Sequence, residues 1–394
     1  MSRNETIDLT PKVEHAFLIA VDTGDDDGWT AEDSLAELAN LADTAGAEVV
    51  GAEWQKRRHI DPNWYLGKGK AQELSEAKRE TGFTMLIADD ELSPKQQKAL
   101  EELLEVKVLD RSGLILDIFA QHARTHEGRL QVELAQLEYQ LPRLTRMWTH
   151  LSRTGGGIGT RGPGETQLET DRRVIRGRIK KLKERVDHVR TQRETAGRSR
   201  DRRLVPSVAI VGYTNAGKSS LLNALSGREA ARAEDQLFAT LDPTSRQVKL
   251  GDGQSVVLTD TVGFIHKLPH QLVDAFRATL EEVARADLLL EVVDGADKHA
   301  REHRETVQTV LEELGAGDKP RVVALNKADL YDPAYAAADT PAPVLGEVVP
   351  VSAVTGYGLD TLRISLSSAM SGLWEHVDVT LPYSEGELLA RVRE

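Results

Sequence analysis

A strand that runs directly into a glycine-rich loop and then into a helix is the feature that most constrains this chain. The apolar run VAIV (208–211) leads into GYTNAGKSS (212–220), and helical LLNALSG follows. The loop matches G-x-x-x-x-G-K-[ST] in the required strand–loop–helix context. Its glycines allow backbone N–H groups to face phosphates, and the helix N-terminus adds a favourable dipole. An ordinary glycine-rich turn is the competing interpretation, and the correct flanks disfavour it.

Two further motifs complete a phosphate and metal site. Lys218 is expected to neutralise the β and γ phosphate oxygens, and Ser219 to ligate Mg²⁺ through its hydroxyl. Downstream, VVLTDTVGF (256–264) ends a strand with Asp-x-x-Gly. Asp260 can hold the hydration shell of the magnesium ion, and Gly263 allows its own N–H to approach the γ-phosphate. The position of this short motif, after the phosphate loop and at a strand's carboxyl end, makes it informative.

A polar loop, LFATLDPTSR (237–246), lies between these motifs. A switch loop needs one threonine that ligates Mg²⁺ while the γ-phosphate is present and releases it afterwards. Thr240 and Thr244 both satisfy that requirement. Two turn threonines without a metal role are the alternative.

The base-recognition motifs favour guanine over adenine. RVVALNKADL (321–330) places Asn-Lys-x-Asp just after a strand. Guanine presents two donors, N1–H and the N2 amine, which the carboxylate of Asp329 can accept together, and adenine lacks this pair. Asn326 is expected to brace the base and its loop, and the stem of Lys327 to pack over the base. After EVVPVSAVTG (347–356), the N–H groups near Ser352 and Ala353 can reach guanine O6. Five elements in this order predict a GTP site.

The position after Asp-x-x-Gly, where many GTPases use a glutamine to orient the attacking water, is Phe264. Phenylalanine cannot orient water, so we expect slow intrinsic turnover, about 10⁻⁴ to 10⁻² s⁻¹, and a partner that completes the site. Alternatively, Phe264 only packs and another residue positions the water.

The pattern of strands and helices predicts four regions. Residues 1–112 form a small parallel α/β domain, with strands at 16–23, 47–54, 83–91 and 106–110 and helices at 30–43, 68–81 and 94–105. Residues 113–203 form a helical hairpin around a glycine-rich, non-helical loop, 154–167. Residues 204–374 form a P-loop GTPase domain, a doubly wound, mostly parallel sheet. Residues 375–394 form a short tail or a truncated C-terminal domain.

The charge distribution points to a basic surface on an acidic body. The net charge is −13, yet residues 143–203 hold 18 Lys and Arg against 7 Asp and Glu. Such a segment is typical of RNA or phosphate binding, and a solvated arginine-rich helix is the alternative. The chain has no cysteine and no apolar run long enough for a membrane span or a secretory signal, which predicts a cytoplasmic protein.

The motifs together resemble the HflX family of GTPases. The resemblance rests on GYTNAGKS, FATLDPT, DTVGF and NKAD, and more specifically on RLQVELAQLEYQLPRL followed by WTHLSRTGGGIGTRGPGETQLETDRR. It implies that Thr240 rather than Thr244 ligates Mg²⁺, and that a hydrophobic residue at position 264 is normal. It also implies binding to the large (50S) ribosomal subunit, dissociation of stalled or idle ribosomes, and stimulation of hydrolysis by the ribosome.

The hairpin 143–203 is then expected to contact ribosomal RNA, with arginines 153, 161, 172 and 173 meeting phosphates. The glycine-rich loop could instead be a hinge or a second phosphate site. A different class of function also remains open, a signalling or assembly switch that acts through protein partners, with the hairpin as a docking arm. A tRNA-modification role would need a cofactor or thiol site, and the chain has no cysteine.

Two expectations concern the ends of the chain. In WYLGKGKAQEL (64–74), the resemblance implies a second purine-nucleotide site, ATP included, whereas a helix-initiating turn with two solvated lysines is the alternative. The family usually has a small domain after the GTPase domain, where this chain has about twenty residues. A monomer is expected.

The predicted site residues fall into three groups. Lys218, Thr240 and Gly263 are expected to take part in hydrolysis, and Ser219 and Thr240 to ligate Mg²⁺. The remaining nucleotide contacts are predicted at Gly212, Tyr213, Thr214, Asn215, Ala216, Gly217, Ser220, Phe238, Ala239, Leu241, Asp242, Asp260, Thr261, Val262, Asn326, Lys327, Ala328, Asp329, Ser352 and Ala353.

Overall fold

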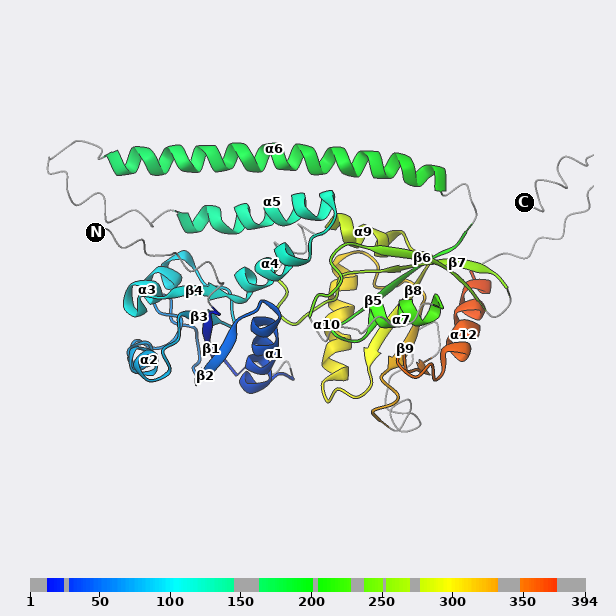
Figure 1. Cartoon of the computed structure of the whole chain (residues 1–394), viewed down its shortest axis with the longest axis horizontal. Coiled ribbons are helices and arrows are strands. Elements are labelled where there is room, and N and C mark those ends of the chain that lie inside the picture. Colours follow the sequence, from blue (N-terminus) through cyan, green and yellow to red (C-terminus); the bar gives the residue numbers. More distant parts are fainter. Residues whose placement is uncertain are drawn as a thin grey trace, which may run out of the picture.

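The computed structural model describes residues 13–24, 28–144, 163–200, 205–227, 237–250, 253–269, 277–331 and 348–373. Two α/β units lie side by side, and two antiparallel helices lie along them, the shorter along the first unit and the longer along both (Figure 1). We refer to the units as the first unit (15–122) and the second unit (207–371), and to the paired helices as the hairpin. None of the described helices is long and apolar enough to cross a lipid bilayer.

The first unit is a four-stranded parallel sheet with strand order β2-β1-β3-β4. Helices α1 and α4 pack on one face, and α2 and α3 on the other. The strands are β1 (His15–Asp22), β2 (Glu48–Lys56), β3 (Met85–Ala88) and β4 (Lys107–Asp110), and the helices are α1 (Ala31–Thr44), α2 (Lys68–Thr81), α3 (Pro94–Leu104) and α4 (Arg111–His122). The small parallel α/β domain predicted from the sequence is therefore present.

The second unit is a six-stranded sheet with strand order β10-β9-β8-β5-β7-β6. All of its neighbouring strands are parallel except β6, which pairs antiparallel with β7. Helices α7 and α12 cover one face, and α9 and α10 the other. Its elements are β5 (Ser207–Gly212), α7 (Lys218–Leu225), β6 (Thr244–Lys249), β7 (Ser255–Asp260), α9 (Arg277–Arg285), β8 (Leu288–Asp294), α10 (Ala300–Glu313), β9 (Arg321–Asn326), β10 (Val348–Pro350) and α12 (Leu359–Ser371). This arrangement confirms the predicted P-loop fold class.

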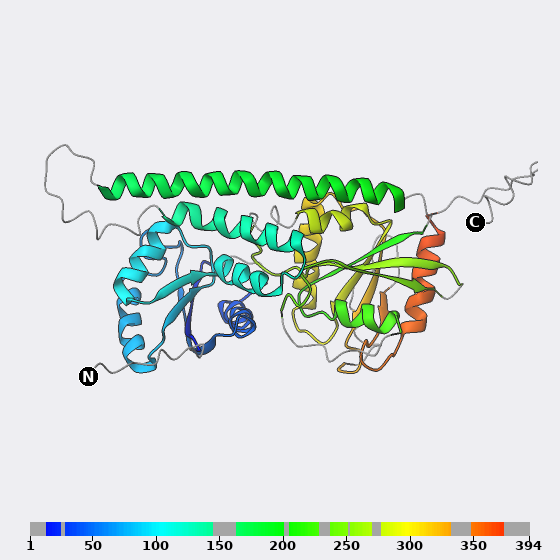
Figure 2. The same ribbon diagram turned by 45° about the horizontal axis from the view of Figure 1, so that its top comes forward.

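The hairpin consists of α5 (His126–Arg143) and α6 (Pro163–Arg200), which run antiparallel above the two units (Figure 2). A separate small core joins them, centred on Leu130, Leu134, Ile179 and Leu182. This contact accounts for the three- and four-residue spacing of leucines in the α5 sequence.

Two local predictions are wrong. The segment 154–167 was expected to be non-helical throughout, but α6 already begins at Pro163. Proline is well suited to a first helical turn, because the N–H that it lacks would have no helical partner there. The polar loop 237–246 was expected to extend through Thr244, but β6 begins at that residue and pairs with β7. The rest of the glycine-rich loop, with Arg153 and Arg161, lies outside the described residues.

The two units share one continuous apolar core. It includes Ile115 and Phe119 of α4, and it continues into the second unit through Phe238 and Phe264. Because α4 packs on the first sheet, the boundary predicted after residue 112 would divide that helix, and we propose a boundary near residue 123.

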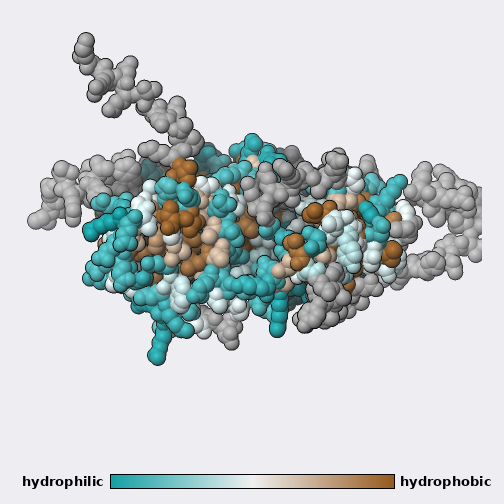
Figure 3. Space-filling model, turned by 60° about the horizontal axis from the view of Figure 1, so that its bottom comes forward, coloured by the Kyte–Doolittle hydropathy of each residue, from teal (hydrophilic) through white to brown (hydrophobic). Residues whose placement is uncertain are grey.

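The surface that faces away from the hairpin is mixed. On the face in Figure 3, apolar residues gather in one area over the first unit and in smaller areas over the second. Strand β2 is an edge of the first sheet, and its Trp54 is 38% exposed.

Candidate functional site

The phosphate loop begins at the carboxyl end of β5 and ends at the first turn of α7. Gly212 and Gly217 have φ values of 150° and 90°. The Lys218 ammonium donates to the main-chain oxygens of Gly212 (3.1 Å) and Tyr213 (2.7 Å), which fold the side chain back over the loop. Burial lowers the pKa of Lys218 to about 8, and the nearby Asp260 opposes this shift only in part. A buried ammonium with carbonyl partners is poised to bind an anion.

Three oxygens of the predicted magnesium site lie together beside this loop. Ser219 Oγ lies 2.6 Å from Asp260 Oδ2 and 2.8 Å from Thr240 Oγ1. Thr240 Oγ1 also donates to Asp260 Oδ2 (2.8 Å). Thr244, the other candidate, is exposed at the start of β6. The structure therefore brings Thr240, and not Thr244, to the phosphate loop.

The donor set of this cluster fits Mg²⁺. Asp260 Oδ1 is buried and has no hydrogen-bond partner among the described residues, so it is available to water that surrounds a metal ion. Burial raises the pKa of Asp260, while Ser219 and Lys218 act in the opposite direction. Within the described ranges no group of three His, Asp or Glu side chains could hold a metal. Hydroxyls, one carboxylate and substrate phosphates are the environment in which Mg²⁺ usually binds.

Gly263 and Phe264 fit closely against the phosphate loop. A Cβ atom at Gly263 would lie 2.9 Å from both Lys218 Nζ and Thr214 Cα, so only glycine fits there. Phe264 N–H donates to Gly212 O (3.1 Å), and Phe264 O accepts from Thr214 N–H (2.7 Å). The Phe264 ring is fully buried in the core shared by the two units. It contributes packing, and it offers no polar group to a water molecule.

The base end of the site is held by Asn326. Its Nδ2 donates to Ala216 O (2.8 Å) and its Oδ1 accepts from Ala353 N–H (3.1 Å), so one side chain joins three loops. Asp329 is exposed, and its Oδ1 accepts from Ser352 Oγ (2.6 Å). Lys327 Nζ lies 2.6 Å from Asp294 Oδ2. This ion pair fixes the stem expected to cover the base.

The N–H groups predicted to contact guanine O6 already have partners within the protein. Ser352 N–H donates to Tyr357 O (3.0 Å), and Ala353 N–H donates to Asn326. To donate to guanine O6, the Ala353 N–H would therefore have to share its hydrogen bond with Asn326 Oδ1 or give it up.

Several predicted contact residues have side chains directed away from the phosphates. Tyr213, Phe238, Leu241 and Val262 are buried in the shared core. Asp242 accepts hydrogen bonds from the main chain at Arg124 and Thr125, each at 2.8 Å. Any contact that Tyr213 makes with the nucleotide is therefore through its main chain.

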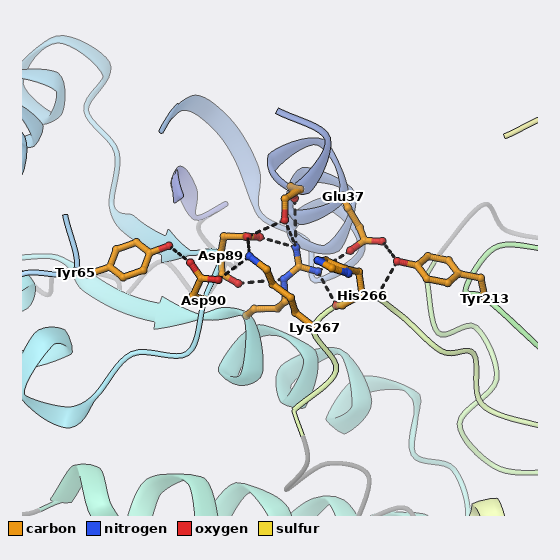
Figure 4. A network of polar contacts seen from close by, with 9 residues as sticks. Glu37, Tyr65, Asp89, Asp90, Tyr213, His266 and Lys267 are labelled. Atoms are coloured by element: carbon orange, nitrogen blue, oxygen red, sulfur yellow. Dashed lines mark hydrogen bonds and ion pairs between the residues drawn. The ribbon is translucent and has the colours of Figure 1, made fainter. Parts of the chain in front are cut away.

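A buried polar network behind the phosphate loop was not predicted from the sequence (Figure 4). Arg111, whose side chain is 2% exposed, pairs with Glu37 Oε2 at 2.6 Å and with Asp89 Oδ1 at 2.5 Å. Its NH1 also donates to His266 O (3.2 Å). Lys267, three residues after Phe264, lies 2.6 Å from both Asp89 and Asp90.

Tyr213 closes this network on the phosphate-loop side. Its hydroxyl donates to Glu37 and accepts from His266 N–H (2.7 Å). Burial raises the pKa of Glu37 despite the Arg111 partner, whereas Arg111 and Lys267 overcome burial and hold the pKa of Asp89 below its usual value. The sequence signal for these residues is weak, because charged side chains far apart in the chain meet only in the folded protein.

The GKGK segment, residues 67–70, lies at the start of α2, with Gly67 at the N-cap. Lys70 Nζ pairs with Glu53 (2.8 Å) and Glu73 (3.1 Å). These contacts favour the interpretation as a helix-initiating turn, although Lys70 is ion-paired and not solvated as that interpretation expected.

The chain matches three protein families in succession. Residues 32–120 match the family described as GTP-binding GTPase N-terminal, residues 122–200 the GTP-binding GTPase Middle Region, and residues 207–327 the 50S ribosome-binding GTPase family. The first two families correspond to the first unit and the hairpin, and the third to the second unit.

Characterised relatives cover most of the chain. The GTPase HflX of Escherichia coli (strain K12) is 48% identical over 91% of this chain and 84% of its own length. The GTPase HflX of Caldanaerobacter subterraneus subsp. tengcongensis is 47% identical over 96% of this chain and 86% of its own. Among solved structures, the SsGBP and GDP complex is similar over 92% of this chain and 99% of that one, with a TM-score of 0.50 and 26% identity.

Proposed function

The chain belongs to the HflX family of GTPases, and from this membership we propose that it binds the large ribosomal subunit and dissociates stalled or idle ribosomes. Its reaction is the hydrolysis of GTP to GDP and phosphate, with Mg²⁺. The observation that carries the proposal is a nucleotide site with a buried phenylalanine in the water-orienting position, joined through one core to a basic hairpin.

In this proposal the chain holds GTP at three points. Asp329 selects guanine, Asn326 holds the base loops against the phosphate loop, and Lys218 meets the β and γ phosphates. When bound, Mg²⁺ neutralises charge on the phosphate oxygens, and Ser219 and Thr240 are placed to hold it. Gly263 presents its N–H to the γ-phosphate, and a side chain at this position would collide with Lys218 and Thr214.

Phe264 cannot orient the attacking water, and in this proposal the ribosome supplies a group that does. A group that orients water or stabilises charge in trans accelerates GTP hydrolysis by about 10³- to 10⁵-fold in related switch proteins. We therefore expect a slow isolated enzyme and strong stimulation by its partner.

The α6 surface supports an RNA partner. Five of its basic residues are exposed and have no carboxylate within ion-pair distance among the described residues. They are Arg173, Arg176, Lys180, Lys181 and Arg185. Phosphate contacts of this kind make binding weaken steeply with added salt.

The test is the GTP turnover rate with purified 50S subunits, with 30S subunits and without either. We expect strong stimulation by 50S subunits and none by 30S subunits. Sucrose gradients of 70S ribosomes with the protein and GTP then measure dissociation. An isolated enzyme that is already fast, or one indifferent to 50S, would contradict the proposal.

Charge reversal separates an RNA partner from a protein partner. The triple variant R176E/K180E/K181E should weaken 50S binding and its salt dependence while GDP affinity remains. Lys56→Glu is the matched control, since Lys56 is also exposed but lies on β2 of the first unit. Unchanged 50S binding by the triple variant would favour the alternative, a switch that acts through protein partners.

A further inference from the structure

The switch loop (residues 237–242) is anchored at both ends to the first unit and the hairpin. Leu237 N–H donates to Thr44 Oγ1 of α1 (3.3 Å). At the other end, the Asp242 carboxylate receives the N–H groups of Arg124 and Thr125, which precede α5. Between these anchors Thr240 turns the opposite way, toward Ser219 and Asp260.

Asp242 is fitted closely to the start of α5. Thr125 is the N-cap of that helix, and its hydroxyl accepts from Gly128 N–H (2.9 Å) while donating to Asp242 Oδ1. A Cβ atom at Gly128 would lie 2.4 Å from Asp242 Oδ1, so the carboxylate occupies space that only a glycine leaves. One side chain of the switch loop thus completes the cap of a hairpin helix.

Phe238 adds an apolar anchor. Its ring packs edge-on against Phe119 of α4, with ring centroids 4.8 Å apart and planes at 76°. Phe238 also has a φ of 56°, which is uncommon for an aromatic residue. A strained backbone held by a buried ring indicates that the surrounding contacts determine the loop conformation.

We propose that Asp242 is a positioning residue that acts through Thr240. Its bonds to the α5 N-terminus hold the switch loop where the Thr240 hydroxyl can ligate Mg²⁺. Because coupling is reciprocal, the same bonds make the order of the α5 N-terminus depend on whether Thr240 is held by a γ-phosphate-bound metal. The hairpin would then sense the nucleotide state through this contact. The inference uses the GTPase site alone and does not depend on a ribosomal partner.

The test is the ratio of affinities for a non-hydrolysable GTP analogue and for GDP. Thr240 matters only while the γ-phosphate is present, so Asp242→Ala should weaken the analogue about tenfold and leave GDP affinity unchanged. The Mg²⁺ concentration needed for analogue binding should rise as well. Asp242→Asn, which keeps one acceptor oxygen, should recover part of the loss. Equal weakening of the analogue and GDP, or no change in either, would overturn the proposal.

Asp61→Ala is the matched control. Asp61 also accepts two backbone N–H groups, from Asn63 (2.8 Å) and Trp64 (3.0 Å), but in the first unit and away from the nucleotide. It should leave the affinity ratio unchanged even where it lowers thermal stability. If Asp61→Ala changed the ratio of analogue to GDP affinity as much as Asp242→Ala does, the change would reflect general destabilisation of the protein.

Two further measurements test the route of the effect. In a Thr240→Ala background, Asp242→Ala should change analogue affinity no further, and full additivity would mean that Asp242 does not act through Thr240. Hydrogen exchange at the amides of Arg124 and Thr125 should be slower with the GTP analogue than with GDP. Equal exchange in both states would remove the proposed coupling to the hairpin.

Discussion

Lys218 is a buried cation whose hydrogen-bond partners are carbonyl groups of its own loop. In the free protein, burial disfavours the charged form of Lys218, and the nearby Asp260 offsets this effect only in part. The pKa of Lys218 therefore falls to about 8. A bound triphosphate reverses this balance, because negative oxygens then favour the charged lysine. Nucleotide binding and protonation of Lys218 are therefore linked.

This linkage predicts a pH dependence of GTP binding. Above pH 8 the free protein loses the Lys218 proton, whereas the complex keeps it, so binding takes up a proton and affinity falls as pH rises. The Kd for GTP should increase about tenfold between pH 7 and pH 9 and change little below pH 7.5. Titration calorimetry in buffers of different ionisation enthalpy measures the proton directly. Absence of proton uptake at pH 9 would contradict a lowered pKa.

Asp329 is predicted to decide base preference. Asp329→Asn replaces one acceptor oxygen with a donor that faces the guanine amine, so GDP affinity should fall by about 10²-fold or more. Xanthine nucleotides, which carry an oxygen in place of that amine, should gain affinity. Asp360→Asn, at an exposed carboxylate in the first turn of α12, is the control and should alter neither affinity. If affinity fell equally for guanine and xanthine nucleotides, the substitution would have damaged the loop and not changed base recognition.

At the scale of elements, the hairpin is held together by a narrow apolar seam. Leu134 and Leu182 are 7% and 3% exposed there, and ion pairs such as Arg178–Glu133 flank them. Flanking pairs on a solvated surface contribute little, so the leucines should supply most of the helix–helix stability.

Leu182→Ala should therefore loosen the hairpin by about 2–5 kcal/mol, while the nucleotide site remains intact. Hydrogen exchange of α6 amides should accelerate, and GDP affinity should not change. Val174→Ala is a suitable control on the same helix, because Val174 is 62% exposed. Similar effects of the two variants would mean that the seam does not hold α6.

The elements differ in how well local sequence predicts them. Most strands of both units and most helices of the first have apolar runs or caps of their own, and α2 lies at the predicted 68–81. Strand β6 was missed because its TSRQVK sequence has one buried residue, Val248, and gains its structure from pairing with β7. The start of α6 was predicted too late in the chain. The prediction gave more weight to the glycines of segment 154–167 than to Pro163, which is favourable at the start of a helix.

At the scale of the whole molecule, Arg111 joins the two units. It lies at the start of α4, contacts α1 and Asp89, which follows β3, and reaches His266 of the second unit. Its two carboxylate partners are almost fully buried, and the arginine compensates the charge of both, together with Lys267 at Asp89.

Arg111→Met should destabilise the protein strongly, by about 3–5 kcal/mol, because Glu37 is then buried without its arginine partner and Asp89 keeps only the ion pair with Lys267. A lower melting temperature at neutral pH is the expected observation, and the loss should diminish at acid pH as these carboxyls accept protons. The control is Arg301→Met, at an arginine that is 82% exposed. A melting temperature equal to that of the control would show that the network contributes little.

The sequence by itself determined the nucleotide chemistry of this protein. The predicted phosphate, metal and base contacts lie in short motifs, because loops at the carboxyl ends of parallel strands meet at one edge of the sheet. Asp260 and Asn326 could therefore be identified from their neighbours in the chain. Tertiary structure alone decided what surrounds that site. Lys267 pairs with Asp89, and Asp242 accepts from the main chain at Thr125, in each case across more than a hundred residues of chain. No local pattern encodes such pairs, since their energy arises only when distant segments are buried together.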